Sequence, residues 1–187
     1  MGIKDTYFLD RNKAVLVVID VQEKLCRAMD PDVLKALTAN ATILLEAAKE
    51  LGLPVIATEQ YVKGLGETLD VLKAHLSVPA LEKMSFSSCG DVKFVDALTA
   101  TGRTQVIITG METHVCVLQT VLELLDAGLT VHVVRDAVMS RHKKNWKTGL
   151  NVMGAAGAVV TSTEAVLFQL LKIAGTEEFK KLSKLVR

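Results

Sequence analysis

The sequence lacks any hydrophobic run long enough to cross a membrane, and its first residues do not show the apolar segment of a secretory signal peptide. A membrane helix needs about 20 mostly apolar residues, and every apolar run in this chain of 187 residues is far shorter. The first five residues, Met1-Gly2-Ile3-Lys4-Asp5, already include two charged side chains. We therefore expect a cytoplasmic protein without a membrane partner.

Paired cysteines and a charge excess are also missing. Cys26, Cys89 and Cys116 show no CxxC spacing, which argues against a disulfide framework and a zinc knuckle. The net charge is only +1, so nothing in the charge balance favours nucleic acid as a partner. Half of the residues are hydrophobic and 23% are charged, which is typical of a globular chain. Residues 1–187 are long enough for one domain with a single sizeable core.

Cofactor motifs are absent as well. There is no GxxxxGK[ST] segment, and the Gly64-Leu65-Gly66 segment lacks the third glycine of a dinucleotide fingerprint. No HxH or HExxH pair occurs, and the chain after the second predicted strand reads Glu59-Gln60-Tyr61. We therefore predict that the protein uses no cofactor and has no metal site.

Apolar, β-branched runs alternate with segments of helical periodicity. Strands are predicted near residues 14–19, 54–58, 80–83, 105–109, 130–136 and 158–160, and helices near 30–51, 91–102, 116–127, 142–156, 163–174 and 177–185, with a loop and one helical turn over 62–76. Uninterrupted apolar strands are buried on both faces. The pattern predicts an α/β fold with a doubly wound parallel sheet and helices on both faces.

Several polar residues come directly after the predicted strands. They are Asp20, Glu59 with Gln60, Lys83, the turn 110–116 and Asp136. In sheets of this kind, ligands bind beyond the carboxyl ends of the strands. These residues are therefore expected to share one rim of the sheet.

Cys116 lies where a strand and a tight turn lead into an apolar helix. The unpaired N–H groups and the positive dipole end of such a helix favour a thiolate. The same pattern also fits a small apolar cysteine packed in a core. This stretch alone leaves both interpretations open.

Asp20 and Lys83 give Cys116 two chemically suitable neighbours. Asp20 ends an apolar strand, where a carboxyl group can act as a base or simply bond a nearby loop. Lys83 stands between Leu81 and Phe86, and a buried ammonium there would need an anionic partner. The alternative is an extended surface lysine. Taken together, the lysine would hold the carboxylate and stabilise the thiolate, the aspartate would move protons, and the thiolate would attack.

The remaining polar and aromatic residues are expected to serve the substrate or the assembly. His114 lies only two residues before Cys116, a poor spacing for a dyad on a helical turn, so we expect a structural or rim position. The side chains expected to line a pocket for a small, partly polar substrate are Gln60, Tyr61, Phe86 and His114. Trp146 is expected in the packing or in a subunit contact, and a homo-oligomer is predicted.

Three segments together resemble the isochorismatase-like cysteine hydrolase superfamily. They are Ile19-Asp20-Val21-Gln22, Lys83, and Gly110-Met111-Glu112-Thr113-His114-Val115-Cys116-Val117. The segments 58–61 with 64–66, and 133–137 with Ser140-Arg141, are similar to its branch of small hydrolases. The resemblance extends over roughly residues 14 to 172 in order and spacing.

This resemblance implies a Rossmann-like sheet of six parallel strands in the order 3-2-1-4-5-6. It implies a catalytic triad of Asp20, Lys83 and Cys116 and a cis peptide between Met111 and Glu112. It also implies an oxyanion hole formed by the backbone N–H groups of Glu112 and Cys116.

The chain departs from two named activities of the superfamily. Nicotinamidases carry an aspartate and histidines after the second strand that bind a metal, and this chain has none there. Isochorismatases that act on the vinyl ether typically have glycine at the position of Cys116. The sequence therefore predicts hydrolysis of a small amide or related C–N bond through an acyl thioester. The alternatives are vinyl ether hydrolysis by Asp20 without the cysteine, and a non-catalytic oligomeric binding module.

Overall fold

A parallel β-sheet organises the chain in the computed structural model, which describes residues 2–186. Its strands are β1 (Ala14–Ile19), β2 (Val55–Gln60), β3 (Leu81–Lys83), β4 (Gln105–Met111), β5 (Thr130–Met139) and β6 (Val159–Thr161). Within the described residues these six strands pair in the order β3-β2-β1-β4-β5-β6, and every pair is parallel. The predicted fold class and strand order are therefore confirmed.

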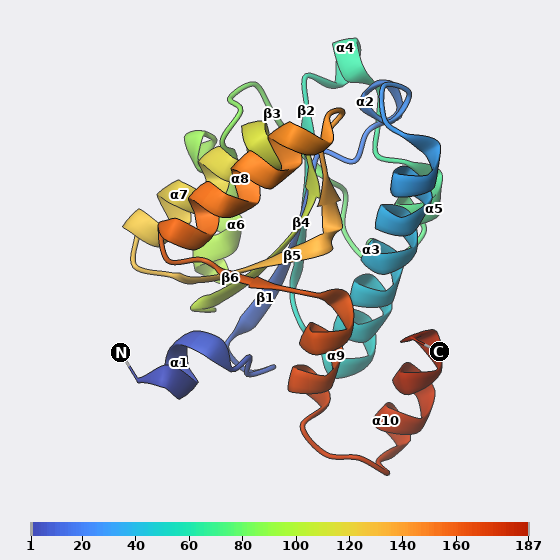
Figure 1. The fold of residues 1–187 in the computed structure, drawn as a ribbon, viewed down its shortest axis with the longest axis vertical. Coiled ribbons are helices and arrows are strands. Elements are labelled where there is room, and N and C mark those ends of the chain that lie inside the picture. The colour runs from blue at the N-terminus through green and yellow to red at the C-terminus, as the bar shows by residue number, and fades with distance from the viewer. Residues whose placement is uncertain (1, 187) are drawn as a thin grey trace.

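Helices cover both faces of the sheet (Figure 1). They are α1 (Ile3–Tyr7), α2 (Glu23–Cys26), α3 (Pro31–Leu51), α4 (Val62–Leu65), α5 (Asp70–Lys73), α6 (Val92–Ala100), α7 (Leu118–Asp126), α8 (Lys143–Ala155), α9 (Thr163–Leu171) and α10 (Glu177–Leu182), with the short turns η1 (Ser88–Gly90), η2 (Thr113–Val117) and η3 (Ser183–Val186). Helices α3, α9 and α10 lie on one face, and α6, α7 and α8 lie on the other. None of the described helices is long and apolar enough to span a membrane.

Strand β1 shows why its sequence is apolar without interruption. All six of its residues are buried. The even-numbered residues belong to the core layer under α3, whereas the odd-numbered residues belong to the layer under α6 and α7. Successive side chains of a strand point to opposite faces, so a sheet covered on both faces requires an apolar residue at every position.

Helix α3 begins and ends where local chemistry predicts. The side chain of Asp30 accepts hydrogen bonds from the backbone N–H groups of Asp32 and Val33, at 3.0 and 3.2 Å, and Pro31 occupies the first helical position. Gly52 ends the helix in the left-handed region, with φ of 70°. The predicted bounds of this helix are confirmed.

The structure differs from the predicted elements mainly near the rim. Strands β4 and β5 extend to Met111 and Met139, because beyond a register shift Gly110 pairs with Val138 and Met111 pairs with Met139. The segment 62–76 contains two short helices, α4 and α5, instead of one helical turn, and α1 and α2 were not predicted. Cys116 lies in the π-helical turn η2 that precedes α7, and not in a regular first turn of that helix. Short helical turns are hard to predict because they contain too few residues to show a period.

Gly110 gives a direct test of how closely β4 packs against β1. Its φ is +123°, and a Cβ atom there would lie 2.0 Å from the carbonyl oxygen of Ile19. We predict that Gly110→Ala lowers the free energy of unfolding by about 3–5 kcal/mol, because backbone atoms cannot move aside. Gly128→Ala is the matched control, since the φ of Gly128 is also positive but open space surrounds this residue. This substitution should lower the free energy of unfolding by about 1 kcal/mol. Urea unfolding of both variants measures the difference, and equal losses would contradict the close packing.

Candidate active site

Asp20 follows β1 directly and is fully buried at the carboxyl edge of the sheet. Its backbone has a φ of 51°, in the left-handed region that aspartate tolerates better than most residues. One carboxylate oxygen, Oδ1, accepts a hydrogen bond from the Thr58 hydroxyl at 2.7 Å. Strand β2 thus fixes the orientation of this carboxylate and leaves Oδ2 for another partner.

Lys83 ends β3, and its side chain is only 1% exposed. Its Nζ atom donates to Asp20 Oδ2 at 2.7 Å and to the carbonyl oxygens of Ser85 and Phe86 at 3.1 and 3.0 Å. These three acceptors match the three hydrogens of an ammonium group, so the buried charge is satisfied. The alternative of a surface lysine is wrong.

Cys116 lies in η2 with a side chain that is almost completely buried. Its thiol donates to Gln60 Oε1 at 3.2 Å. Burial, followed by the Asp20 carboxylate, raises the pKa of this thiol to about 12, while the Lys83 ammonium and the backbone N–H of Glu112 act in the lowering direction. Desolvation and an adjacent anion therefore outweigh the neighbouring donors and oppose the thiolate that the helix start favours.

The peptide bond between Met111 and Glu112 is cis, as the resemblance implies. The backbone N–H of Glu112 forms a hydrogen bond with the Cys116 sulfur. The carboxylate of Glu112 contacts Arg141 instead, with Oε2 accepting from the backbone N–H and from Nε of that arginine at 2.9 and 3.2 Å. The glutamate therefore presents its amide to the thiol and uses its side chain to anchor the turn.

Gln22 is a contributor for which the sequence predicted no role. Its side chain is buried, and its Nε2 atom donates to the carbonyl oxygens of Gln60 and Gly66 at 3.0 and 2.6 Å. Its Oε1 atom accepts from the backbone N–H of Gln60 at 2.8 Å. Gln22 thus fixes the residue whose side chain accepts from the Cys116 thiol. The sequence signals were its position two residues after Asp20 and its place in the segment 19–22 that carries the family resemblance.

The four predicted pocket residues lie in different surroundings. Gln60 contacts the thiol directly, and Phe86 contributes its carbonyl oxygen to Lys83 while its side chain remains exposed. Tyr61 is also exposed, next to Gly64. His114 pairs through Nδ1 with Ser140 Oγ at 3.0 Å and through Nε2 with the Asn145 side chain at 3.2 Å. Both imidazole nitrogens are thereby occupied away from the thiol.

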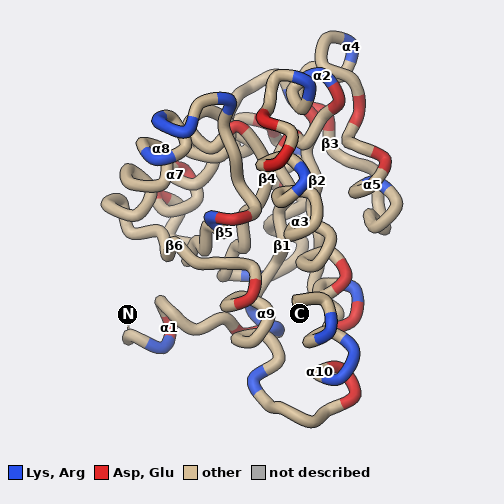
Figure 2. The backbone as a smooth tube through the Cα atoms, turned by 45° about the vertical axis from the view of Figure 1, so that its right-hand side comes forward, with Lys and Arg blue, Asp and Glu red and all other residues tan. Residues whose placement is uncertain are grey.

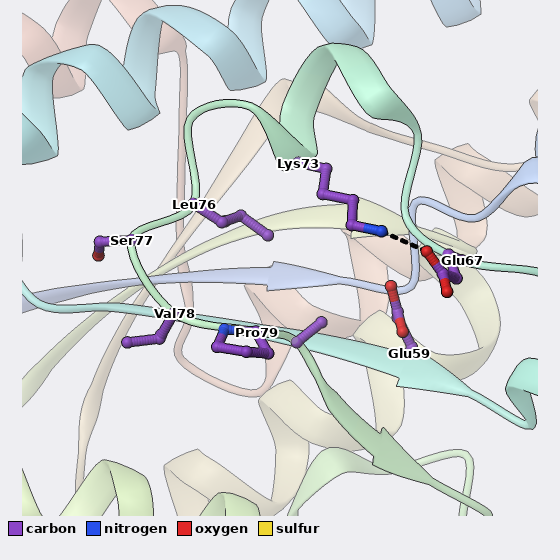
Figure 3. A pocket seen from close by; sticks show the side chains of 8 residues that line it. Glu59, Glu67, Lys73, Leu76, Ser77, Val78 and Pro79 are labelled. Atoms are coloured by element: carbon purple, nitrogen blue, oxygen red, sulfur yellow. Dashed lines mark hydrogen bonds and ion pairs between the residues drawn. The ribbon is translucent and has the colours of Figure 1, made fainter.

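A separate pocket of about 400 Å³ lies between the end of β2 and α5 (Figure 3). Its charged side chains already have partners: Lys73 pairs with Glu67, and Glu59 accepts from the backbone N–H and the hydroxyl of Thr68 at 2.6 and 2.7 Å. These contacts hold the loop over residues 66–68 against β2. The pocket's charges therefore serve the fold.

Among residues 2–186, no three His, Cys, Asp or Glu side chains come together as a metal site would require. Lys and Arg positions are interspersed with Asp and Glu positions along the backbone (Figure 2).

Residues 14–165 match the family model of the isochorismatase domain. The chain belongs to this family. It is 40% identical over 183 residues to the secreted isochorismatase effector Isc1 of Phytophthora sojae, a match that covers 94% of this chain and 85% of that protein. The relative is described as secreted, so a cytoplasmic location for this chain stays a prediction.

Solved structures extend the comparison. A structure described as MAR1 ribonuclease from Caenorhabditis elegans superimposes with a TM-score of 0.89 and 37% identity, covering 96% of this chain and 92% of that one. YcaC of Escherichia coli, described as an octameric hydrolase of unknown specificity, superimposes with a TM-score of 0.87 and 27% identity. The match covers 95% of this chain and 90% of that one. YcaC of Pseudomonas aeruginosa, described with hexane-2,5-diol and covalent acrylamide, superimposes with a TM-score of 0.89 and 27% identity. The match covers 99% of this chain and 93% of that one. This chain is therefore an isochorismatase-family hydrolase.

The effect of Asp20 on Cys116 predicts a pH-dependent reactivity. With a pKa of about 12, the wild-type thiol stays protonated near neutrality and should react slowly with iodoacetamide, faster as the pH rises. Asp20→Asn removes an anion that raises this pKa, so the thiolate fraction near pH 8 should increase by about tenfold for each unit of downward shift. Mass spectrometry of the alkylated peptide measures the rate.

Cys89 is the internal control in the same samples. Its pKa is raised to about 11 by its own burial and by Glu123, so its alkylation should not change in Asp20→Asn. A Cys116 rate that stays constant or falls in the variant would contradict the electrostatic coupling.

Proposed function

We propose that this chain hydrolyses a small amide or a related C–N bond, with Cys116 as nucleophile, Asp20 as proton carrier and Lys83 as the fixed cation. The observation that carries the proposal is the shared buried cluster: Lys83 contacts Asp20 at 2.7 Å, and both charges act on the thiol of Cys116. A buried carboxylate, ammonium and thiol meeting at the ligand-binding edge of a parallel sheet suit covalent catalysis.

The first half of the reaction forms an acyl thioester. Asp20 takes the thiol proton as the Cys116 sulfur attacks the carbonyl carbon, and the S–C bond places negative charge on the carbonyl oxygen. The backbone N–H groups of Glu112 and Cys116 would hold this oxyanion, each donor contributing about 3 kcal/mol in comparable sites. Asp20 then passes the proton to the nitrogen, and the C–N bond breaks to release the amine.

The second half uses the same groups on water. Asp20 accepts a proton from water as its oxygen attacks the thioester carbon, and collapse of the intermediate breaks the S–C bond. The acid leaves, and the proton returns from Asp20 to the sulfur. Lys83 holds the Asp20 carboxylate in position through the short contact and makes no bond to substrate.

The high pKa of Cys116 is compatible with this route. The thiol needs to lose its proton only while the S–C bond forms, and Asp20 lies beside it to accept that proton. A protonated thiol is also protected from unspecific oxidation and alkylation. Pseudomonas YcaC is described with covalent acrylamide, and acrylamide is an electrophile, which supports a nucleophilic residue within this fold.

Two other activities remain as rivals. Vinyl ether hydrolysis would use Asp20 as an acid and leave Cys116 unreacted, and turnover insensitive to iodoacetamide would favour it. A non-catalytic binding module would show no turnover and no acyl adduct. The ribonuclease description of the nematode structure gains no support here, because cations and anions are interspersed and the net charge is only +1.

Replacement of the nucleophile is the decisive test. Cys116→Ala should lower kcat by about 10⁴-fold or more, because the covalent route is lost, while the protein remains folded. Intact-mass measurement after incubation with a panel of small amides should show an acyl adduct on the wild type and none on this variant.

Cys89→Ala is the matched control, since this cysteine is free and lies outside the cluster. It should retain activity and the adduct. Turnover by Cys116→Ala at the wild-type rate would remove the cysteine from the mechanism.

We also infer that the chain forms a homo-oligomer, since the E. coli relative at 27% identity is described as octameric. Exposed apolar side chains such as Phe86, Val92 and Met84 suit a buried contact. Native mass spectrometry should give a multiple of the 20.2 kDa chain mass; a monomer at micromolar concentration would refute this.

A further inference from the structure

A groove of about 640 Å³ lies where β5 extends beyond its neighbour β6. Strand β6 pairs only with residues 132–134 of β5, so residues 135–139 have no strand on that side within residues 2–186. The first half of α3 and the start of α8 form the walls. The residues that line the groove do not include Asp20, Lys83 or Cys116.

The groove has an apolar floor and one flat aromatic wall. Leu37, Val138 and Met139 lie on the floor and are buried. The indole N–H of Trp146 donates to the carbonyl oxygen of Val138 at 3.1 Å, which fixes the ring. The Arg135 guanidinium lies 5.7 Å from the centre of this ring, so a cation stands beside a flat apolar surface.

Some charged groups in the groove have hydrogen-bond partners within the protein, and others do not. The Asp30 carboxylate caps α3, and the Asp136 carboxylate accepts from the backbone N–H and hydroxyl of one threonine. The backbone N–H and Nε of Arg141 donate to the Glu112 carboxylate. The two terminal guanidinium nitrogens of Arg141 remain available to a ligand. In the described structure these nitrogens and the Arg135 guanidinium have no carboxylate partner. Guanidinium groups bind carboxylates through paired hydrogen bonds.

The exposed edge of β5 is closed to another strand. The carbonyl oxygen of Asp136 accepts from the Asn40 side chain at 2.8 Å, and the carbonyl oxygen of Val138 accepts from Trp146. A peptide adding to this edge would need those two acceptors. The occupant is therefore a compact molecule, held by side chains.

We propose that this groove is a second ligand site, separate from the cysteine cluster, for a small organic anion with a flat apolar body. The body lies against Trp146 and the floor, and its carboxylate pairs with Arg135 and Arg141. The volume is within the range of small-molecule sites, about 300–1,000 Å³. The groove is lined by three acidic residues, Asp30, Asp32 and Asp136, and three basic ones, Arg135, Arg141 and Lys143. Selectivity for an anion therefore depends on the guanidinium nitrogens that lack a carboxylate partner, and not on a net positive charge.

Trp146 provides the measurement, because it is the only tryptophan of the chain. Its fluorescence therefore reports this groove alone. Titration of the purified full-length protein with benzoate should give a saturable change in emission. Benzyl alcohol, which has a similar ring but no charge, should bind at least about tenfold more weakly, because the paired hydrogen bonds to the arginines are lost.

Variants separate this site from the proposed catalysis. Arg135→Gln and Arg141→Gln should each weaken benzoate binding about tenfold or more. Arg11→Gln removes an arginine that pairs with Glu178 outside the groove, and this variant should bind benzoate as the wild type does. Cys116→Ala should also bind benzoate as the wild type does, so failure of the proposed hydrolysis would leave this result standing.

Any of four outcomes would overturn the proposal. The first three are no saturable response to benzoate at millimolar concentration, equal responses to benzoate and benzyl alcohol, and unchanged binding in both folded arginine variants, with folding checked by circular dichroism. A fourth is Trp146 emission that changes on dilution in step with the native mass, which would show that a second copy of the chain fills the groove.

Discussion

The buried contact between Asp20 and Lys83 is the constraint on which the rim of the sheet depends. It joins the ends of β1 and β3, two strands separated by β2. Neither charge reaches water, so each requires the other, and loss of one partner from such a pair typically costs about 3–5 kcal/mol. The Thr58 hydroxyl and the carbonyl oxygens of the turn after β3 satisfy the remaining positions. The pair therefore fixes the geometry before any substrate arrives.

The same pair determines the state of the cysteine. Burial and Asp20 keep the Cys116 thiol protonated, while Lys83 and the Glu112 amide oppose them. The turn that carries this amide is held from the other side, by Arg141 on Glu112 and by Ser140 on His114. Arg141 and Ser140 also line the groove beside β5. Relatives described as an effector, a ribonuclease and a hydrolase share this fold, so the site residues, and not the fold, must decide the substrate.

Much of the fold followed from local patterns. Uninterrupted apolar strands, the Asp30 cap and the Gly52 stop of α3 depend on residues close together in the chain, and each agrees with the structure. The helical turns near the rim and the extra length of β4 and β5 did not follow. They contain few residues, or they exist because a neighbouring strand offers hydrogen bonds, and neither condition leaves a periodic signal.

The sequence by itself determined the sheet, its strand order through the family resemblance, and the residue types at the rim. Only the tertiary structure decided which of those residues touch: that Lys83 is buried on Asp20, that Gln22 fixes Gln60, and that His114 contacts Ser140 and Asn145 and not the thiol. It also decided that burial and Asp20 outweigh the donors around the Cys116 thiol. A pKa depends on desolvation and on charges brought together from distant segments, and those distances are set by packing.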